Sequence, residues 1–184
     1  MRLGLISQIK NEIDIIIPFL EHIDSLFDCI YLLDHQSIDG TTDLLKQAVS
    51  QRNSWKYYFL DFKGQYQKKI ANFFLPMIFQ ENVDYLFFLD ADEFINVENR
   101  KMLEVNLSRI TSNSRVGRLQ WINTSPITFE QNRFSFSTPL IQSPNSSFYG
   151  KVVLPRNIYL SDPNITIEIG SHHVRNKGKE ILPE

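Results

Sequence analysis

Three carboxylates directly follow one strongly apolar segment of the sequence. In the stretch 83–95, VDYLFFLDADEFI, residues with strand propensity run to Leu89, and Asp90, Asp92 and Glu93 come next. In an open α/β sheet, ligands bind just beyond the carboxyl ends of the strands, so carboxylates placed there could meet a ligand. Oxygen ligands suit Mg²⁺ or Mn²⁺, which are often held by one or two carboxylates together with substrate phosphates. Acidic residues after a strand are equally typical of turns and helix caps, so the motif alone leaves both interpretations open.

The segments around this motif are predicted to alternate between strands and helices. Apolar runs predict strands at 3–9, 29–33, 55–60 and 83–89, and helical periodicity predicts helices at 13–27, 42–50 and 65–80. We expect Asn11 to cap the first helix and Pro18 to kink it. Strands that alternate with helices of this length indicate parallel crossovers and a nucleotide-binding type of sheet. Neither GxGxxG nor GxxxxGK[ST] occurs, which excludes the dinucleotide fingerprint and the P-loop.

The second half of the chain changes character. A helix is expected near 101–111, and shorter strand-like stretches follow at 116–122, 151–154 and 165–169. Several prolines divide this half into loops. We therefore predict an α/β fold whose mostly parallel sheet, flanked by helices, is joined to a mixed, partly antiparallel C-terminal part.

The composition limits the partners and the location of the protein. With 184 residues, of which 42% are hydrophobic, the chain can bury a core and is too apolar for disorder. A net charge of −2 gives no basic surface for nucleic acid, so no such partner is expected. The longest apolar run, 15–20, is too short to span a bilayer, and no signal-type segment opens the chain. The single Cys29 fits a reducing compartment, so we expect a cytoplasmic protein, with peripheral contact to the inner face of the membrane left open.

Four segments occur in the order, and near the spacing, of a known family. They are ISQIKNE, YLLDHQSIDGTTDLL, the helical QKKIANFF, and YLFFLDADEF. On these segments, roughly the first hundred residues resemble glycosyltransferases of the GT-A fold, family 2 type, and the form D-x-D-E-F resembles a bacterial subgroup that decorates surface polysaccharides. The resemblance implies one GT-A-like domain over 1–184, with a nucleotide-sugar-binding half, 1–98, and an acceptor-side half, 99–184.

Donor-binding residues follow from the resemblance, position by position. Asn11 and Glu12 would lie beside the nucleotide, and Asp34 would hold its base or ribose. The segment 37–40 matches the family's S-x-D-G turn, although a plain turn and helix cap explains it equally well. The remaining implied donor-binding residues are Lys68, Asn72, Asp90 and Lys151. For a lysine on a helix, a solvated surface position is the alternative.

The resemblance also implies a divalent metal, Mn²⁺ or Mg²⁺, bridging the donor's two phosphates. Asp90 and Asp92 would bind it, and a late histidine, His172 or His173, would complete the site. We expect both histidines in a strand, where neighbours point opposite ways, so that only one of them reaches the metal. Inverting members use a carboxylate as general base. Glu130 is the default candidate because it is the only acidic residue between 113 and 161, ahead of Asp162 and Glu168.

The predicted function is transfer of a sugar from a nucleotide-diphosphate donor, by resemblance a UDP-sugar, to a hydroxyl of a glycan or lipid-linked saccharide precursor, with inversion. The family's acidic pair is missing, which motivates an alternative: a catalytically inactive sugar-nucleotide-binding or interaction module of the same fold. A phosphatase that uses D-x-D after its first strand is disfavoured, because QIKNE stands there. Self-association is left open.

Overall fold

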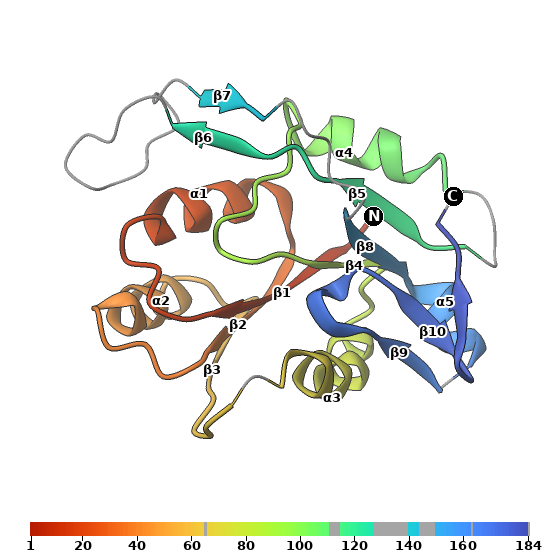
Figure 1. Cartoon of the computed structure of the whole chain (residues 1–184), viewed down its shortest axis with the longest axis horizontal. Helices are drawn as coiled ribbons and strands as arrows, with labels where there is room; N and C mark the ends of the chain where they lie inside the picture. Colours follow the sequence, from red (N-terminus) through yellow and green to blue (C-terminus); the bar gives the residue numbers. More distant parts are fainter. Residues whose placement is uncertain (65, 111–114, 127–139, 144–149, 163, 184) are drawn as a thin grey trace.

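Six strands form one sheet through the middle of the computed structural model (Figure 1), which describes residues 1–64, 66–110, 115–126, 140–143, 150–162 and 164–183. From edge to edge, the strands are β3 (Trp55–Phe59), β2 (Cys29–Asp34), β1 (Leu3–Ile9), β4 (Tyr85–Phe88), β8 (Gly150–Pro155) and β5 (Gly117–Gln120). The first four of these strands are parallel, whereas β8 pairs antiparallel with both β4 and β5. The predicted α/β class, with a mostly parallel sheet and a mixed second part, is confirmed.

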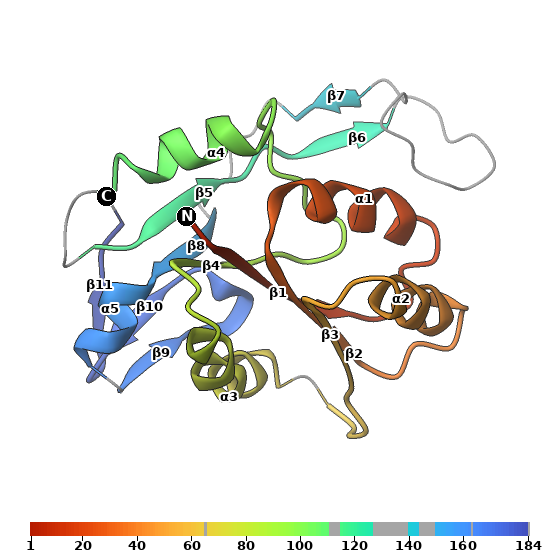
Figure 2. The same ribbon diagram turned by 180° about the vertical axis from the view of Figure 1, so that it is seen from behind.

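Helices and a small second sheet cover the two faces of the central sheet, as Figure 2 shows from behind. One face carries α1 (Ile16–Leu26), α2 (Thr41–Ser50) and α4 (Arg100–Leu107). The other face carries α3 (Gln67–Gln80), α5 (Arg156–Ser161) and the sheet of β9 (Ile165–Ile167), β10 (Val174–Asn176) and β11 (Lys179–Ile181). The strands β6 (Thr124–Pro126) and β7 (Leu140–Gln142) pair with each other, and the 3₁₀ turn η1 (Ile169–Ser171) follows β9.

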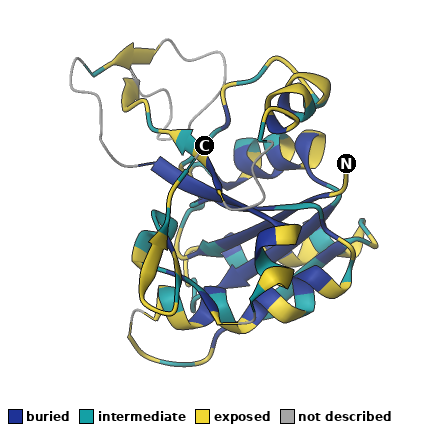
Figure 3. Ribbon diagram, turned by 90° about the vertical axis from the view of Figure 1, so that its right-hand side faces the viewer, coloured by how far each residue is buried: buried dark blue, intermediate teal, exposed yellow. Residues whose placement is uncertain are grey.

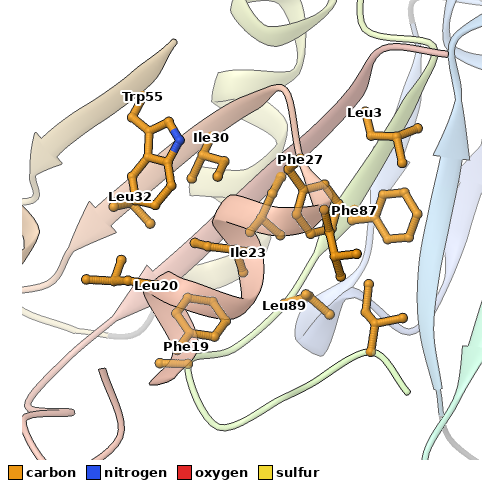
Figure 4. Packing of buried hydrophobic residues seen from close by; sticks show 14 of the residues in the cluster. Leu3, Phe19, Leu20, Ile23, Phe27, Ile30, Leu32, Trp55, Phe87 and Leu89 are labelled. Carbon is orange, nitrogen blue, oxygen red and sulfur yellow. The ribbon is translucent and has the colours of Figure 1, made fainter. Parts of the chain in front are cut away.

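Strand β1 illustrates why a core forms on each face. Leu5 and Ile9 belong to the core under α1, whereas Ile6, with the opposite side-chain direction, belongs to the core under α3. The inner parallel strands β2, β1 and β4 are buried on both sides, whereas the edge strands β3 and β5 are partly exposed and the helices keep exposed outer faces (Figure 3). Figure 4 shows the α1 core, where the rings of Phe27 and Phe87 meet edge to face with centres 5.0 Å apart. Each such side chain contributes about 1.5–3 kcal/mol by leaving water.

Two expectations about the first helix are wrong. Helix α1 begins at Ile16, so Pro18 lies in its first turn, where a missing N–H breaks no intrahelical bond and gives no cause for a kink. Asn11 does not cap the helix, because it has a positive φ of 57° and Ile15 occupies the cap position. The later helix is also shorter than expected: α4 ends at Leu107.

Within the described residues, no helix combines the length and the apolar character needed to cross a membrane.

Candidate functional site

Each of the six strands has one end at the same edge of the central sheet, and β3 ends there like its parallel neighbour β2. The parallel strands β2, β1 and β4 all end there. Strand β8 runs the opposite way, so it begins at this edge with Gly150 and Lys151, and β5, antiparallel to β8, ends here at Gln120. Because ligands of open α/β sheets bind beyond the carboxyl ends of the strands, the polar residues at this edge form the candidate site.

Lys151 is buried beside the acidic motif. Its Nζ lies 2.7 Å from Oδ2 of Asp90 and 3.5 Å from Oε2 of Glu93, and its side chain is only 3% exposed. Glu93 Oε2 also accepts a 2.9 Å hydrogen bond from the backbone N–H of Asp90. Gly150 permits the close pairing of β8 with β5, because a Cβ there would lie 2.1 Å from the carbonyl oxygen of Leu119. A buried ammonium is costly unless it is paired, so these carboxylates stabilise the start of β8 at the end of β4.

Two glutamates near this edge have raised pKa values. Burial raises the pKa of Glu12 to about 7, and the charges of four nearby aspartates, Asp92 first, add to the rise. Burial likewise raises the pKa of Glu93 to about 7, although the ammonium of Lys151 opposes it. Burial is the larger cause at both glutamates, neighbouring carboxylates add to it, and Lys151 opposes it at Glu93.

Asp90 and Asp92 fit a divalent cation by their chemistry. Both carboxylates reach solvent, and carboxylate oxygens are the ligands that Mg²⁺ and Mn²⁺ prefer. Among the residues that the structure describes, no three His, Cys, Asp or Glu side chains are placed to hold a metal ion. Two carboxylates are nevertheless a common protein contribution where phosphates and water supply the other ligands. The residues present therefore fit a cation that binds together with a phosphorylated ligand.

Hydrogen bonds join the loops that follow β1 and β2. The backbone N–H groups of three consecutive residues, 11–13, each donate to a side chain of the segment 37–41. The three acceptors are Ser37 Oγ at 2.9 Å, Thr41 Oγ1 at 2.9 Å and Asp39 Oδ2 at 3.1 Å. In return, Asn11 Oδ1 accepts from the N–H of Ile38 at 2.8 Å. The S-x-D-G segment is thus a turn that fixes the position of Asn11 and Glu12, whose predicted donor contacts stay predictions.

Asp34 is fully buried at the end of β2. Its Oδ1 accepts from the N–H of Ser37 at 3.0 Å, and its Oδ2 accepts from the hydroxyls of Thr42 at 2.6 Å and Tyr57 at 2.9 Å. Burial alone would raise the pKa of Asp34, but these hydrogen bonds outweigh burial and lower it. Asp34 therefore organises the turn after β2, and its contact with a base or ribose stays a prediction.

Lys68 and Asn72 of α3 bind the segment around β9. Nζ of Lys68 lies 2.9 Å from each carboxylate oxygen of Glu168. The Asn72 amide both donates to the carbonyl of Ile167 and accepts from its N–H, at 2.8 Å each, so it replaces a neighbouring strand. These contacts attach the small second sheet to α3, and the predicted donor contacts of both residues remain untested.

The expectation that both histidines lie in a strand is wrong. Strand β9 ends at Ile167, because Gly170 and Ser171 then take positive φ values of 70° and 55°. His172 and His173 lie in the connection between η1 and β10.

The two imidazoles have different partners. Nδ1 of His172 lies 3.1 Å from the carbonyl oxygen of Gly150, so this nitrogen carries a proton that it donates. Nδ1 of His173 lies 2.7 Å from a carboxylate oxygen of Glu180. Metal binding by either histidine stays a prediction, and Glu130, the predicted base, lies outside the described residues.

Sequence reasoning did not predict the specific contacts of two residues at this edge. Glu93 folds back onto Asp90 through a 3.1 Å backbone hydrogen bond, and the three-residue spacing of a turn was the available signal. Trp121 follows β5 and places its ring centre 5.8 Å from Nζ of Lys151. No local pattern could have found this contact, because it depends on the pairing of β5 with β8.

A hollow of about 460 Å³ lies at the opposite edge of the sheet. Asp84 and Tyr85 at the start of β4 and Arg156 at the start of α5 are among its lining residues. Among its described lining residues, Asp84 alone supplies a carboxylate. The acidic motif therefore marks the carboxyl edge, and not this hollow, as the candidate site.

The comparisons with known proteins bear on the fold. No family model and no curated protein matches the sequence. Among solved structures, HddC from Yersinia pseudotuberculosis is similar over 100% of this chain and 89% of its own, with a TM-score of 0.51 and 12% identity. The mannosyltransferase PcManGT from Pyrobaculum calidifontis, in complex with GDP-Man and Mn²⁺, is similar over 65% of this chain, with a TM-score of 0.49 and 14% identity. The bifunctional glycosyltransferase WbbM is similar over 89% of this chain, with a TM-score of 0.49 and 12% identity.

The lengths differ between these proteins. The chain spans 36% of the mannosyltransferase and 33% of WbbM. Identities this low bear on the fold alone. The chain is similar to HddC along all of its own length. Its mixed sheet β3-β2-β1-β4-β8-β5, with helices on both faces, has the α/β fold of the GT-A and nucleotidyltransferase type.

Proposed function

We propose that the chain is a metal-dependent glycosyltransferase. It would move a sugar from a nucleotide-diphosphate donor, such as a UDP-sugar, to a hydroxyl of a glycan or lipid-linked saccharide. The observation that carries the proposal is the meeting of Asp90, Asp92 and the buried Lys151 at the carboxyl edge of the sheet. This edge offers carboxylates that could bind the metal ion and an ammonium that could attract the phosphates.

The donor would lie across the strand ends. Its nucleoside would contact the loops that carry Asn11 and Asp34, and its diphosphate would lie over Asp90 and Asp92. Mn²⁺ or Mg²⁺, held by these two aspartates, would neutralise the charge that develops on the leaving diphosphate. The ammonium of Lys151 supplies a second positive charge beside Asp90, at a fixed position.

The acceptor hydroxyl must lose a proton as the new bond forms. Glu130 is proposed as the general base. Exchange of Glu130 for Gln would then lower kcat and leave donor binding unchanged, whereas unchanged transfer would rule out Glu130 as the base.

A second candidate function is donor binding without catalysis. The lack of the family's acidic pair between 113 and 161, where Glu130 is the only acidic residue, motivates it. Under this alternative, a nucleotide would bind but no sugar would be transferred to any acceptor.

Calorimetric titration with UDP, GDP and dTDP, each with Mn²⁺ and with EDTA, tests the proposed site. We expect one nucleotide to bind only with the metal, and Asp92→Asn to weaken binding at least tenfold. Glu98→Gln, an exposed acid on the same loop, is the matched control and should bind as wild type does. If no nucleotide binds with Mn²⁺ present, or if Asp92→Asn binds as tightly as the control, the proposal fails. Assay of donor turnover then separates the transferase from the binding module.

A further inference from the structure

Trp121 occupies the last position of the candidate site along the edge of the sheet. It directly follows Gln120, the final residue of β5. Since β4 and β5 both pair antiparallel with β8, they run in the same direction, and their ends lie at the same edge. Trp121 therefore lies beyond Lys151 in the spatial order β2, β1, β4, β8, β5.

Neighbouring side chains fix the orientation of the indole. The imidazole of His172 meets it edge to face, with ring centres 5.0 Å apart and planes at 89°. His172 is held in turn by its Nδ1–H bond to the carbonyl of Gly150. Between the indole and the acidic motif lies Lys151. Its Nζ is over the indole ring, 5.8 Å from the ring centre, and 2.7 Å from Oδ2 of Asp90. The ring is thus half-buried and oriented before any ligand arrives.

The order of the strands gives the order of ligand groups. A donor whose nucleoside lies at the ends of β2 and β1, with its diphosphate at β4, extends its sugar toward β8 and β5. Within the part of the chain that the structure describes, Trp121 is the aromatic residue at that end of the site. Aromatic rings suit the apolar face of a pyranose, because they bury large areas at low cost in side-chain entropy.

We propose that Trp121 is the platform on which the pyranose ring of the donor sugar stacks. This inference rests on the proposed function, because the path from base to sugar is set by a diphosphate at Asp90 and Asp92. It goes further by assigning the sugar subsite to the end of β5. Trp121 then contributes to binding of the hexose and little to binding of the nucleotide.

The chain offers a built-in optical probe for this contact. It contains two tryptophans, and Trp55 is only 4% exposed in the α1 core. In a Trp55→Phe background, all indole fluorescence comes from Trp121. We expect UDP-glucose, GDP-mannose or dTDP-glucose, whichever carries the base found by calorimetry, to change this emission in the presence of Mn²⁺. The matching nucleoside diphosphate should change it at least threefold less.

Affinities of variants complete the test. Trp121→Ala should weaken binding of the nucleotide sugar about tenfold and binding of the nucleoside diphosphate less than twofold, and Trp121→Phe should restore most of the loss. Ile122→Ala, a change at the exposed neighbouring residue, is the control. Equal losses for both ligands, or no loss for either, would overturn the assignment while leaving the nucleotide site intact. If no nucleotide binds to wild type, the proposed function fails and this assignment fails with it.

Discussion

At the scale of single residues, Glu12, a carboxylate near the acidic motif, makes the stability of the folded protein depend on pH. Glu12 is partly buried and lies close to Asp92 and Asp90, and burial first, with these charges adding to it, raises its pKa in the folded protein to about 7 instead of 4.5. The unfolded chain therefore releases the proton of Glu12 more readily than the folded chain does. Stability contributed by Glu12 is present below pH 4.5 and is lost as the pH rises to about 7. The ionised form of Glu12 at this edge thus destabilises the folded protein at neutral pH and above.

Glu12→Gln should consequently stabilise the protein above pH 7 and change little at pH 4.5. Because Glu12 is partly exposed, we expect about 1–2 kcal/mol at pH 8, or roughly 2–8 °C in Tm. Thermal unfolding followed by circular dichroism between pH 4.5 and 8 measures the effect, with Glu98→Gln as control. A Tm difference that does not grow with pH would show that the raised pKa of Glu12 is not its cause.

At the scale of elements, the β1–α1 and β2–α2 loops form one unit. Asp39 joins them, because Oδ2 accepts from the N–H of Ile13 at 3.1 Å and Oδ1 from the N–H of Thr41 at 3.0 Å. Gly40 adopts φ 104° directly after it, so the turn is fixed in a conformation that few other residues reach. The geometry of this unit determines where Glu12 lies relative to the acidic motif.

Asp39→Ala should loosen both loops at once. Removing the carboxylate leaves two backbone N–H groups without their acceptor, which we expect to cost about 1–3 kcal/mol of the free energy of unfolding. Urea denaturation measures this loss, and amide hydrogen exchange at Ile13 and Thr41 should accelerate together. Asp14→Ala, a change at an exposed residue on the same loop, is the control. If only one of the two amides exchanges faster, the loops are not coupled through Asp39.

At the scale of the whole molecule, the sequence was informative where a structural rule is local. Apolar runs predicted β1, β2 and β4, because strands buried on both faces need continuous apolar segments, and aromatic residues predicted the partly exposed edge strand β3. The same pattern could not predict that Lys151 pairs with Asp90, since that contact spans 61 positions and depends on β8 entering the sheet antiparallel. The turn at Gly170 and Ser171 was missed for another reason: two successive positive φ values interrupt a segment whose residues alternate as a strand does.

The two halves of the chain also share one sheet, which has a consequence for folding. Strand β8 pairs with β4 through Leu86 opposite Leu154 and Phe87 opposite Val153. The second half further supplies core residues to both faces, among them Leu103, Leu107, Val152, Ile158, Ile165 and Ile167. Losing several such side chains removes about 10 kcal/mol or more, which is comparable to the 5–15 kcal/mol stability of a typical domain.

The fragment 1–98 should therefore not fold alone, even though it contains the whole acidic motif. We expect narrow amide dispersion in its ¹⁵N-correlated NMR spectrum and no cooperative thermal transition. Adding the fragment 99–184 is the control that the fragment 1–98 is still able to fold. If the two fragments reassemble, the amide dispersion of 1–98 appears only in the mixture. A well-dispersed spectrum of 1–98 by itself would mean that β1 to β4 form an independent unit, and that Lys151 and Trp121 belong to a separable part added to it.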